Sequence, residues 1–378
     1  MSEFYIGLMS GTSIDGIDAG LVDFSEVNPR FIDFEYLPFP EQLRIQLSKL
    51  ASTHEPILLR DYGTLDTQLG YLFANAVHNL LAKAGLSASA ITAIGSHGHT
   101  VYHAPHLATP FSLQIGDPNI IAQRTGITTV ADFRRRDIAA HGQGAPLVPA
   151  FHQAIFTNSE ENRVIVNIGG IANITVLPKK NPDWVMGFDT GPGNTLMDQW
   201  IGKYKNVNYD TDGDWAKSGC VNQELLKLLK SDPYFADKAP KSTGKEYFSL
   251  EWLMQRGEAL SDYRIEDVQA SLCHLTTETI CDAIHRYGPE TERALICGGG
   301  VHNKFLIALI QQQLSCPVAS TENYGLHPDH VEAIAFAWLA RQTINNLPGN
   351  LTRVTGAQSQ VILGGIYQGI PAQKTQAG

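Results

Sequence analysis

Apolar and polar residues alternate near the start of the chain, which predicts two strands joined by a tight turn. Residues 5–9 form a short apolar run, a turn of Gly, Ser, Thr and Asp follows, and alternation resumes over residues 17–24. Alternation with a period of two is typical of a half-buried strand, and a glycine-rich link between two such runs is typical of a hairpin. We therefore expect a hairpin with a glycine-rich tip at residues 11–18.

The same pattern recurs in the second half of the chain. Residues 163–168 resemble a strand, residues 169–173 form a turn that contains Gly169 and Gly170, and residues 174–177 form a second apolar run. No sequence repeat links the two halves. Each half nevertheless opens with a hairpin whose tip is rich in glycine, so the architecture itself is repeated.

Between and after these hairpins, helical and strand-like segments alternate. Helical spacing of apolar residues predicts helices over residues 68–84, 303–314 and 331–344, and short apolar runs predict strands over residues 91–96, 128–133 and 294–297. The strand at 91–96 is expected to lead into a histidine-rich loop. Strands and helices that alternate in both halves predict an α/β fold with mixed sheets.

Length and composition limit the classes of protein that this chain can be. The 378 residues suit two domains of roughly 150–200 residues each. Residues 139–147 are small and turn-forming, which suits a hinge between them. The formal net charge of -10 argues against nucleic acid, which needs a basic face. It does not exclude ATP, because loop geometry and a metal ion bind phosphates locally.

The sequence also predicts a cytoplasmic protein without a membrane span. The first residues contain no basic segment followed by an apolar one, so we expect no export signal. No uncharged apolar run approaches the roughly 18 residues of a membrane helix. The five cysteines are scattered and form no CxxC pair, which is typical of reduced thiols.

The tip at residues 11–18 has the residue types that a phosphate-binding turn needs. Backbone N–H groups must converge on the phosphate without obstruction, and glycines at the tip allow this. Its hydroxyls add donors, and Asp15 or Asp18 can hold a hydrated magnesium ion. No Walker motif occurs, and an ordinary hairpin turn is the alternative. The residues assigned to nucleotide here are Gly11, Thr12, Ser13, Ile14, Asp15, Gly16, Ile17 and Asp18.

The second tip, with Gly169 and Gly170, has the same functional interpretation and the same alternative. Two such tips, one in each half, favour a nucleotide held between two lobes. An apolar run then places Asp189 at the end of a strand, directly before a rigid Gly-Pro-Gly turn at residues 191–193. A carboxylate in that position can act as a general base. The alternative is that Asp189 caps the turn or the following helix.

Four histidines lie close together at His97, His99, His103 and His106. Imidazoles at short spacing can bind zinc, but the spacing is not HExxH and no cysteine or second ligand cluster accompanies them. We expect one histidine to recognise a sugar hydroxyl and the others to be exposed.

Three consecutive arginines, Arg134, Arg135 and Arg136, offer bidentate donors for a substrate carboxylate or phosphate. The alternative is that all three are solvated or paired with Asp132 and Asp137.

Two later segments also have a structural alternative. Glu332 follows Asp329 by three residues, which fits a capping box at the start of a helix. Three glycines at residues 298–300 follow a strand. They would let adenine approach the backbone closely, or they form a simple turn between strand and helix.

Taken together, these segments resemble the anhydro-N-acetylmuramic acid kinase family, within the superfamily that includes actin, hexokinase and heat-shock ATPases. The similarity runs nearly from end to end. The matching segments are GLMSGTSIDGID at 7–18, GSHG at 95–98, LQIGDP at 113–118, DFR at 132–134, GQGAPL at 142–147, NIGGIAN at 167–173, FDTGPGN at 188–194, KSTG at 241–244, CGGG at 297–300 and EAIAFA at 332–337.

The resemblance implies a two-lobed actin-like ATPase fold of ribonuclease H-like domains with a central nucleotide cleft. The N-terminal lobe would span residues 1–140, completed by residues near 330–378, and the C-terminal lobe residues 141–329. The implied reaction opens 1,6-anhydro-N-acetylmuramic acid with water and phosphorylates O6 from ATP with Mg²⁺, giving N-acetylmuramic acid 6-phosphate in cell-wall recycling. A homodimer is a reasonable expectation from the family.

The resemblance also implies roles for individual residues. Asp189 would activate the water, and the sugar pocket would contain His97, Arg134, Glu332 and Gly191, with Arg134 binding the lactyl carboxylate. The adenosine side would contain Gly299 and Gly300. Two positions depart from the family pattern: His99 stands where Gln is commoner, and His141 where Gly is.

Other classes remain as alternatives. Another sugar kinase of the same fold is one, and an actin-like or chaperone-like ATPase is a second, although it needs a polymerisation surface or a peptide-binding domain. A glycoside hydrolase without ATP is a third; it leaves the two glycine-rich tips without a purpose and expects a second carboxylate as acid.

Overall fold

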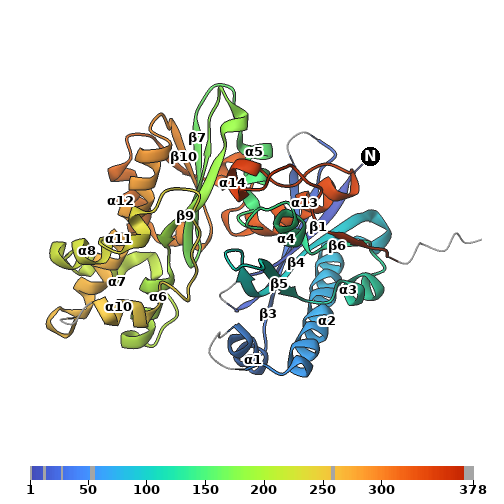
Figure 1. Ribbon diagram of the computed structural model, residues 1–378, viewed down its shortest axis with the longest axis horizontal. Helices are drawn as coiled ribbons and strands as arrows, with labels where there is room; N and C mark the ends of the chain where they lie inside the picture. Colours follow the sequence, from blue (N-terminus) through green and yellow to red (C-terminus); the bar gives the residue numbers. More distant parts are fainter. Residues whose placement is uncertain (1, 12–13, 27–28, 52–55, 257–259, 370–378) are drawn as a thin grey trace, which may run out of the picture. The chain divides into compact units, whose positions relative to one another are not determined.

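The computed structural model describes residues 2–11, 14–26, 29–51, 56–256 and 260–369, and the chain divides into two compact units (Figure 1). The first unit consists of Met1–Phe151 and His330–Gly378, and the second of His152–Asp329. The first unit is therefore built from both ends of the chain. None of the helices in the described ranges is long and apolar enough to cross a membrane.

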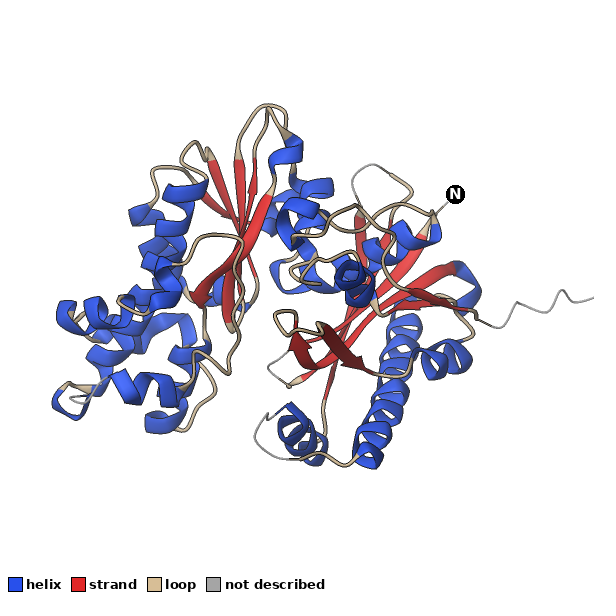
Figure 2. Cartoon of the chain, viewed as in Figure 1, coloured by secondary structure: helices blue, strands red, loops and turns tan. Residues whose placement is uncertain are grey.

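The first unit contains one mixed sheet with helices on both faces (Figure 2). Its strands are β1 (Phe4–Ser10), β2 (Gly16–Asp23), β3 (Arg30–Pro38), β4 (Ile91–Ala104), β5 (Phe111–Ile115), β6 (Thr129–Ala131) and β12 (Gly365–Tyr367). Its helices are α1 (Glu41–Ala51), α2 (Leu59–Ala84), η1 (Ala88–Ala90), α3 (Pro118–Thr125), α4 (Phe133–Ala139), α13 (Val331–Ile344) and α14 (Thr352–Thr355). Helix α5 (Val148–Phe156) contains the boundary with the second unit.

The second unit contains a smaller sheet and most of the remaining helices. Its strands are β7 (Arg163–Ile168), β8 (Ile171–Leu177), β9 (Met186–Pro192), β10 (Arg293–Cys297) and β11 (Val318–Ser320). Its longer helices are α6 (Thr195–Lys205), α7 (Asp214–Ser218), α8 (Gln223–Lys230), α9 (Pro233–Ala236), α10 (Leu250–Arg256), α11 (Ile265–Tyr287) and α12 (Lys304–Gln313). Short 3-10 turns are η2 (Pro182–Trp184), η3 (Thr211–Gly213), η4 (Leu260–Asp262), η5 (Gly299–His302), η6 (Thr321–Tyr324) and η7 (Pro328–His330).

The two sheets share one strand order. In the first, the order is β3-β2-β1-β4-β6, followed by β12 at the edge, and in the second it is β9-β8-β7-β10-β11. In each, the first three strands in sequence pair antiparallel. The first strand then pairs parallel with β4 or β10, which pairs parallel with β6 or β11, and in the first sheet β5 also pairs antiparallel with β4. This is the strand order of a ribonuclease H-like domain. Two such domains in one chain confirm the predicted actin-like α/β fold with mixed sheets.

Both predicted hairpins are present. Strands β1 and β2 pair from Phe4 with Asp23 to Met9 with Asp18, and β7 and β8 pair from Arg163 with Leu177 to Ile168 with Ala172. The expected helices also form: α2 ends at Gly85, whose φ of 65° suits a glycine cap. One prediction was wrong. The strand expected at residues 91–96 continues to Ala104, so the histidines lie on a strand and not in a loop.

The segment expected to act as a hinge belongs to the first unit. Asp137 is fully buried, and its carboxylate accepts hydrogen bonds from the Gly144 backbone N–H at 2.8 Å, Asn350 Nδ2 at 2.7 Å and Thr355 Oγ1 at 2.7 Å. These bonds tie the loop after α4 to the C-terminal part of the same unit. The boundary between the units follows later, after Phe151.

Helix α13 packs on the first sheet through glycines. Ile6 and Leu8 lie in the core that includes α2, whereas Gly7 faces α13, as the alternation of a strand requires. A Cβ at Gly7 would overlap the carbonyl oxygen of Ala333, and a Cβ at Gly95, its partner on β4, would overlap the carbonyl oxygen of Phe336. The backbone of the helix therefore lies directly on the backbone of the sheet.

We predict that Gly7→Ala destabilises the first unit by roughly 3 kcal/mol, because the added methyl group meets backbone atoms that cannot move aside without separating α13 from the sheet. Urea unfolding measures the effect as a lower midpoint.

Gly63→Ala is the matched control for this change. Gly63 lies inside α2 and a Cβ there meets nothing within 4 Å, so alanine is expected to stabilise the helix by up to about 1 kcal/mol. An unchanged midpoint for Gly7→Ala would contradict the close packing of α13.

Candidate functional site

The tip between β1 and β2 is a tight turn held by its neighbours. The Ile14 N–H donates to the Gly11 carbonyl at 3.2 Å, and Ile14 has a φ of 56°. Arg44 Nε donates to the Ile14 carbonyl at 3.2 Å, and the Phe39 N–H donates to the Asp15 carbonyl at 2.9 Å. Of the residues assigned to nucleotide here, Thr12 and Ser13 lie outside the described residues.

Two residues of the first tip have a structural explanation. A Cβ at Gly16 would lie 2.6 Å from the Leu37 carbonyl oxygen and 2.7 Å from the Tyr36 ring, so glycine is needed for the approach of β3. Ile17 is fully buried in the core of the first unit, so its side chain is part of the packing.

Asp15 and Asp18 place negative charge beside this tip. Asp15 is exposed and Asp18 is half-buried. Burial raises the pKa of the Tyr36 hydroxyl, and the charges of Asp15 and Asp18 raise it further. Both carboxylates therefore act on the same side chain, at the end of the hairpin where a cation can be held.

His97 and Arg134, 37 residues apart in sequence, meet in the first unit. Arg134 donates to His97 Nε2 from Nε at 3.1 Å and from Nη2 at 2.8 Å, while its Nη1 donates to the Gly144 carbonyl at 2.8 Å. His97 Nδ1 lies 3.0 Å from the Gly98 carbonyl oxygen and donates to it, because Nε2 is the acceptor. Burial lowers the pKa of His97 well below its ordinary value, and the Arg134 charge lowers it further. His97 is therefore neutral with a fixed tautomer.

The other two arginines do not share this arrangement. Arg135 is exposed and pairs with Asp132 at 3.1 Å, and Arg136 is exposed. Asp137 binds backbone and neutral side chains instead of an arginine. The alternative that all three arginines are solvated or paired with aspartates is therefore wrong for Arg134.

The expectation that the histidines besides the sugar-binding one are exposed is wrong for His99, which is buried. Its Nδ1 lies 3.1 Å from Ser10 Oγ, and its Nε2 is buried without a hydrogen-bond partner. His103 is half-buried, with Nδ1 3.0 Å from Ser112 Oγ, and only His106 is exposed. Among the residues that the structure describes, no group of three or more His, Cys, Asp or Glu is placed to hold a metal ion.

Glu332 lies in the first turn of α13. The helix begins after His330, whose side chain makes no capping hydrogen bond, and Asp329 pairs with His302 at 2.8 Å. The N-cap of α13 is therefore His330 and not Asp329, the residue that the capping-box alternative needs. Residues four apart share a helix face, so Glu332 lies one turn before Phe336, whose ring centroid is 4.6 Å from that of His97. The close packing of α13 thus brings Glu332 to the same side of the sheet as His97.

The second unit contains the Gly169–Gly170 tip. Its carbonyl groups accept hydrogen bonds from three successive N–H groups of the turn after β9: Asn194 donates to Gly169 at 2.8 Å, and Gly193 and Thr195 donate to Gly170 at 2.9 and 3.1 Å. The carbonyl groups of this tip are thus bound to the start of α6. These hydrogen bonds hold the tip and the Gly-Pro-Gly turn together.

Asp189 lies on β9, half-buried, and its carboxylate is held by a distant segment. The Thr243 N–H donates to Asp189 Oδ2 at 3.0 Å, and the Asp189 N–H donates to the Lys241 carbonyl at 3.1 Å. Tyr234 Oη donates to the Asp189 carbonyl at 2.7 Å. The N-cap of α6 is Asn194, so Asp189 does not cap this helix.

Gly191 is buried beside an aromatic ring. A Cβ there would lie 2.7 Å from Phe235 Cε1, and the φ of 151° also favours glycine. The structural requirement at Gly191 is thus clear from packing alone.

The three glycines after β10 form the turn between strand and helix. A Cβ at Gly298 would lie 2.8 Å from the Ile168 carbonyl oxygen, and a Cβ at Gly300 would overlap the Ile168 side chain. Gly299 is exposed, with open space around it. Gly298 and Gly300 therefore allow this turn to pack on the end of β7, next to the Gly169–Gly170 tip.

Residues 241–245, KSTGK, belong to the candidate site, although their sequence pattern predicted no role for them. Lys241 Nζ donates to the Tyr234 carbonyl at 2.8 Å and lies 4.3 Å from the centre of its ring. Thr243 holds Asp189, and Lys245 lies on Gly170. The only signal in the sequence was that KSTG matches the family. The hydrogen bond between Thr243 and Asp189 depends on the fold, because the two residues are far apart in the chain.

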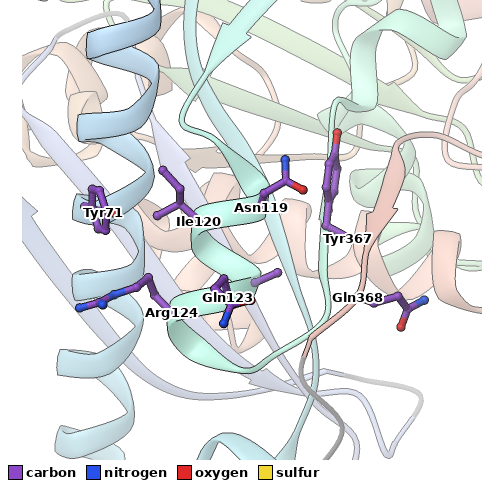
Figure 3. Close-up of a pocket in the computed structure, with 8 residues that line it drawn as sticks. Tyr71, Asn119, Ile120, Gln123, Arg124, Tyr367 and Gln368 are labelled. Carbon is purple, nitrogen blue, oxygen red and sulfur yellow. The ribbon is translucent and has the colours of Figure 1, made fainter.

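Two pockets lie near the surface of the described residues, one in each unit. One of about 390 Å³ in the first unit lies between α2, α3 and β12 and contains none of the predicted site residues (Figure 3). Its polar lining includes Asn119, Gln123 and Arg124. A pocket of about 70 Å³ in the second unit is lined by Phe188 and Thr190, which flank Asp189 on β9.

The comparisons with known proteins decide the family. The sequence pattern of the family Anhydro-N-acetylmuramic acid kinase matches residues 3–369. The chain belongs to this family. An anhydro-N-acetylmuramic acid kinase from Pasteurella multocida is 50% identical over 367 residues, covering 96% of each chain. One from Vibrio vulnificus is 50% identical over 368 residues, covering 97% of this chain and 98% of the relative.

A solved structure with a similar fold is that of (R)-2-hydroxyglutaryl-CoA dehydratase component A from Acidaminococcus fermentans, with a TM-score of 0.48 and 10% identity over 89% of this chain and 96% of that one.

The departure from the family pattern at His141 has a visible consequence. His141 has a φ of 65°, in the left-handed region that favours glycine. Glycine, the residue that the resemblance led us to expect here, would adopt this conformation without strain.

We predict that His99 makes the stability of the first unit depend on pH. Burial lowers the pKa of His99 to about 4, against about 6.5 when unfolded, so the unfolded state binds more protons between these values. Stability is present above pH 6.5 and falls with pH by up to roughly 3 kcal/mol as pH 4 is approached. The free energy of unfolding of His99→Gln is expected to depend less on pH across this interval.

His78→Gln is the control, since His78 is exposed on α2. Equal pH dependence in the wild type and His99→Gln would refute the assignment to His99.

Proposed function

We propose that this protein opens 1,6-anhydro-N-acetylmuramic acid with water and transfers the γ-phosphoryl group of ATP to O6. The observation that carries the proposal is 50% identity to family members over almost the whole chain. The position of Asp189 also supports the proposal. Its carboxylate accepts a hydrogen bond from the Thr243 N–H, and it precedes the turn that binds the Gly169–Gly170 tip. The product is N-acetylmuramic acid 6-phosphate, which belongs to cell-wall recycling and amino-sugar catabolism.

The proposed reaction couples opening of the anhydro bridge to phosphoryl transfer. Asp189 takes a proton from water while the water oxygen bonds to the anomeric carbon and the bond from that carbon to O6 breaks. The released O6 bonds to the γ-phosphorus, and ADP leaves with the electrons of the broken phosphate bond. The products are the sugar phosphate, ADP and one proton. The hydrogen bond from Thr243 keeps the Asp189 carboxylate in one orientation for this transfer.

In the first unit, we assign His97, Arg134 and Glu332 to the sugar. The guanidinium of Arg134 is oriented by His97 Nε2 and the Gly144 carbonyl, and it is the natural partner of the lactyl carboxylate. Because His97 is neutral, it orients Arg134 without repelling it. Glu332 would accept hydrogen bonds from sugar hydroxyls. In the second unit, Gly191 would contribute backbone to the sugar site.

Both tips are assigned to the phosphates of ATP, and Gly299 and Gly300 to its adenosine side. Mg²⁺ usually binds one or two carboxylates together with substrate phosphates and keeps several waters. Asp15 and Asp18 at the first tip offer two carboxylates for that mode. The ion would neutralise phosphate charge, and either carboxylate would hold it through water.

We also propose a cytoplasmic location and a homodimer. The five cysteines are free thiols, four of them buried, as expected in a reducing compartment. The homodimer is proposed from family membership.

The experiment that tests the function measures product formation from anhydro-N-acetylmuramic acid with and without ATP, alongside a panel of anhydro and reducing amino sugars. Stoichiometric ADP formation only in the presence of the anhydro sugar is expected. Sugar turnover that continues unchanged without nucleotide would identify a hydrolase, and preference for a reducing sugar would identify another sugar kinase.

We predict that Asp189→Asn lowers kcat by roughly 10²- to 10⁴-fold, the usual contribution of a general base, with Kd for ATP changed less than about threefold. Steady-state kinetics and calorimetry measure the two effects. Asp183→Asn, at an exposed residue of η2, is the control and should be neutral. A near-normal kcat in Asp189→Asn would remove this carboxylate from the mechanism.

A further inference from the structure

Lys245 lies across one glycine of the second tip. A Cβ at Gly170 would overlap Lys245 Cε and lie 2.9 Å from its Nζ, so the ammonium group rests directly over the backbone of the tip. Gly169 is different, because a Cβ there would meet only the Ile171 carbonyl oxygen at 3.5 Å. The two glycines therefore differ: Gly169 has open space beside it, whereas the missing side chain of Gly170 is replaced by the side chain of Lys245.

A half-buried acid acts on the same lysine. Asp198 lies in the first turn of α6, next to the turn whose N–H groups bind the tip's carbonyl groups. Burial raises the pKa of Asp198 to about 7, the positive charge of Lys245 lowers it, and the charge of Asp210 raises it. The charge of Lys245 thus acts on an acid of α6, the helix whose first residues bind the tip's carbonyl groups.

We propose that Lys245 binds the phosphate chain of the nucleotide at the Gly169–Gly170 tip. The inference rests on the proposed function, which assigns this tip to phosphate. The glycine turn carries no net charge, and its carbonyl groups are bound to the start of α6. The ammonium group of Lys245 supplies the positive charge that attracts phosphate. A purely structural role, in which Lys245 only anchors residues 241–245, is the alternative.

The first test measures the binding of ATP, ADP and adenosine without sugar, by calorimetry. Lys245→Met is expected to weaken ATP and ADP roughly 10- to 100-fold, the effect of losing a charge-assisted hydrogen bond, and to leave adenosine unchanged. Lys245→Arg should restore most of the affinity. Lys238→Met is the matched control, since Lys238 is exposed in the preceding loop. Unchanged ATP affinity, or equal weakening of adenosine, would overturn the proposal.

The second test uses Gly170→Ala. The new methyl group would push Lys245 aside, because the overlapping atom is the end of a flexible side chain. ATP binding should therefore weaken in the wild-type background but not further in Lys245→Met. Loss of equal size in both backgrounds would show that the glycine contributes to ATP binding independently of the lysine, which would contradict displacement of Lys245 as the cause.

These outcomes are distinct from failure of the proposed function. If the wild-type chain neither binds ATP nor consumes it with the anhydro sugar, the function is wrong. If the wild type does both and Lys245→Met binds ATP normally, only the role of Lys245 is wrong.

Discussion

The first unit depends on the contact between the backbone of α13 and the backbone of β1 and β4. Gly7 and Gly95 are paired across these strands, and neither position tolerates a Cβ beneath the helix. A larger residue at either site would lift α13 and with it Phe336, on which the His97 ring rests. The positions of His97 and, through it, of Arg134 therefore depend on glycine at residues 7 and 95.

In the second unit, hydrogen bonds from loops fix the Gly169–Gly170 tip and Asp189 of β9. The turn after β9 binds the carbonyl groups of the Gly169–Gly170 tip, and residues 241–245 bind the backbone and carboxylate of Asp189. A charged group and a backbone turn are both fixed by short hydrogen bonds from elsewhere in the chain. Such sites lose little conformational entropy when a substrate arrives, which favours fast and specific chemistry.

Much of this arrangement follows from local pattern, and the rest requires the fold. Period-two alternation was enough to predict both hairpins, and helical spacing was enough for α13. Glycine was ambiguous, because a missing side chain serves ligand approach and close packing equally: Gly16 and Gly300 are explained by neighbours that the sequence does not reveal. The pair of His97 and Arg134 joins β4 to α4, so no spacing rule could have selected Arg134 from its two neighbours.

Because α13 belongs to the first unit, synthesis and folding of this protein run in different orders. Residues 152–329 are contiguous, so the second unit has all of its chain while the ribosome is still translating. The first unit emerges earlier, yet its sheet lacks the helix that covers Gly7 and Gly95 until residues 331–344 have left the exit tunnel. Domains usually fold from the N-terminus onward during translation. Here the N-terminal sheet lacks its covering helix until the second unit has been synthesised.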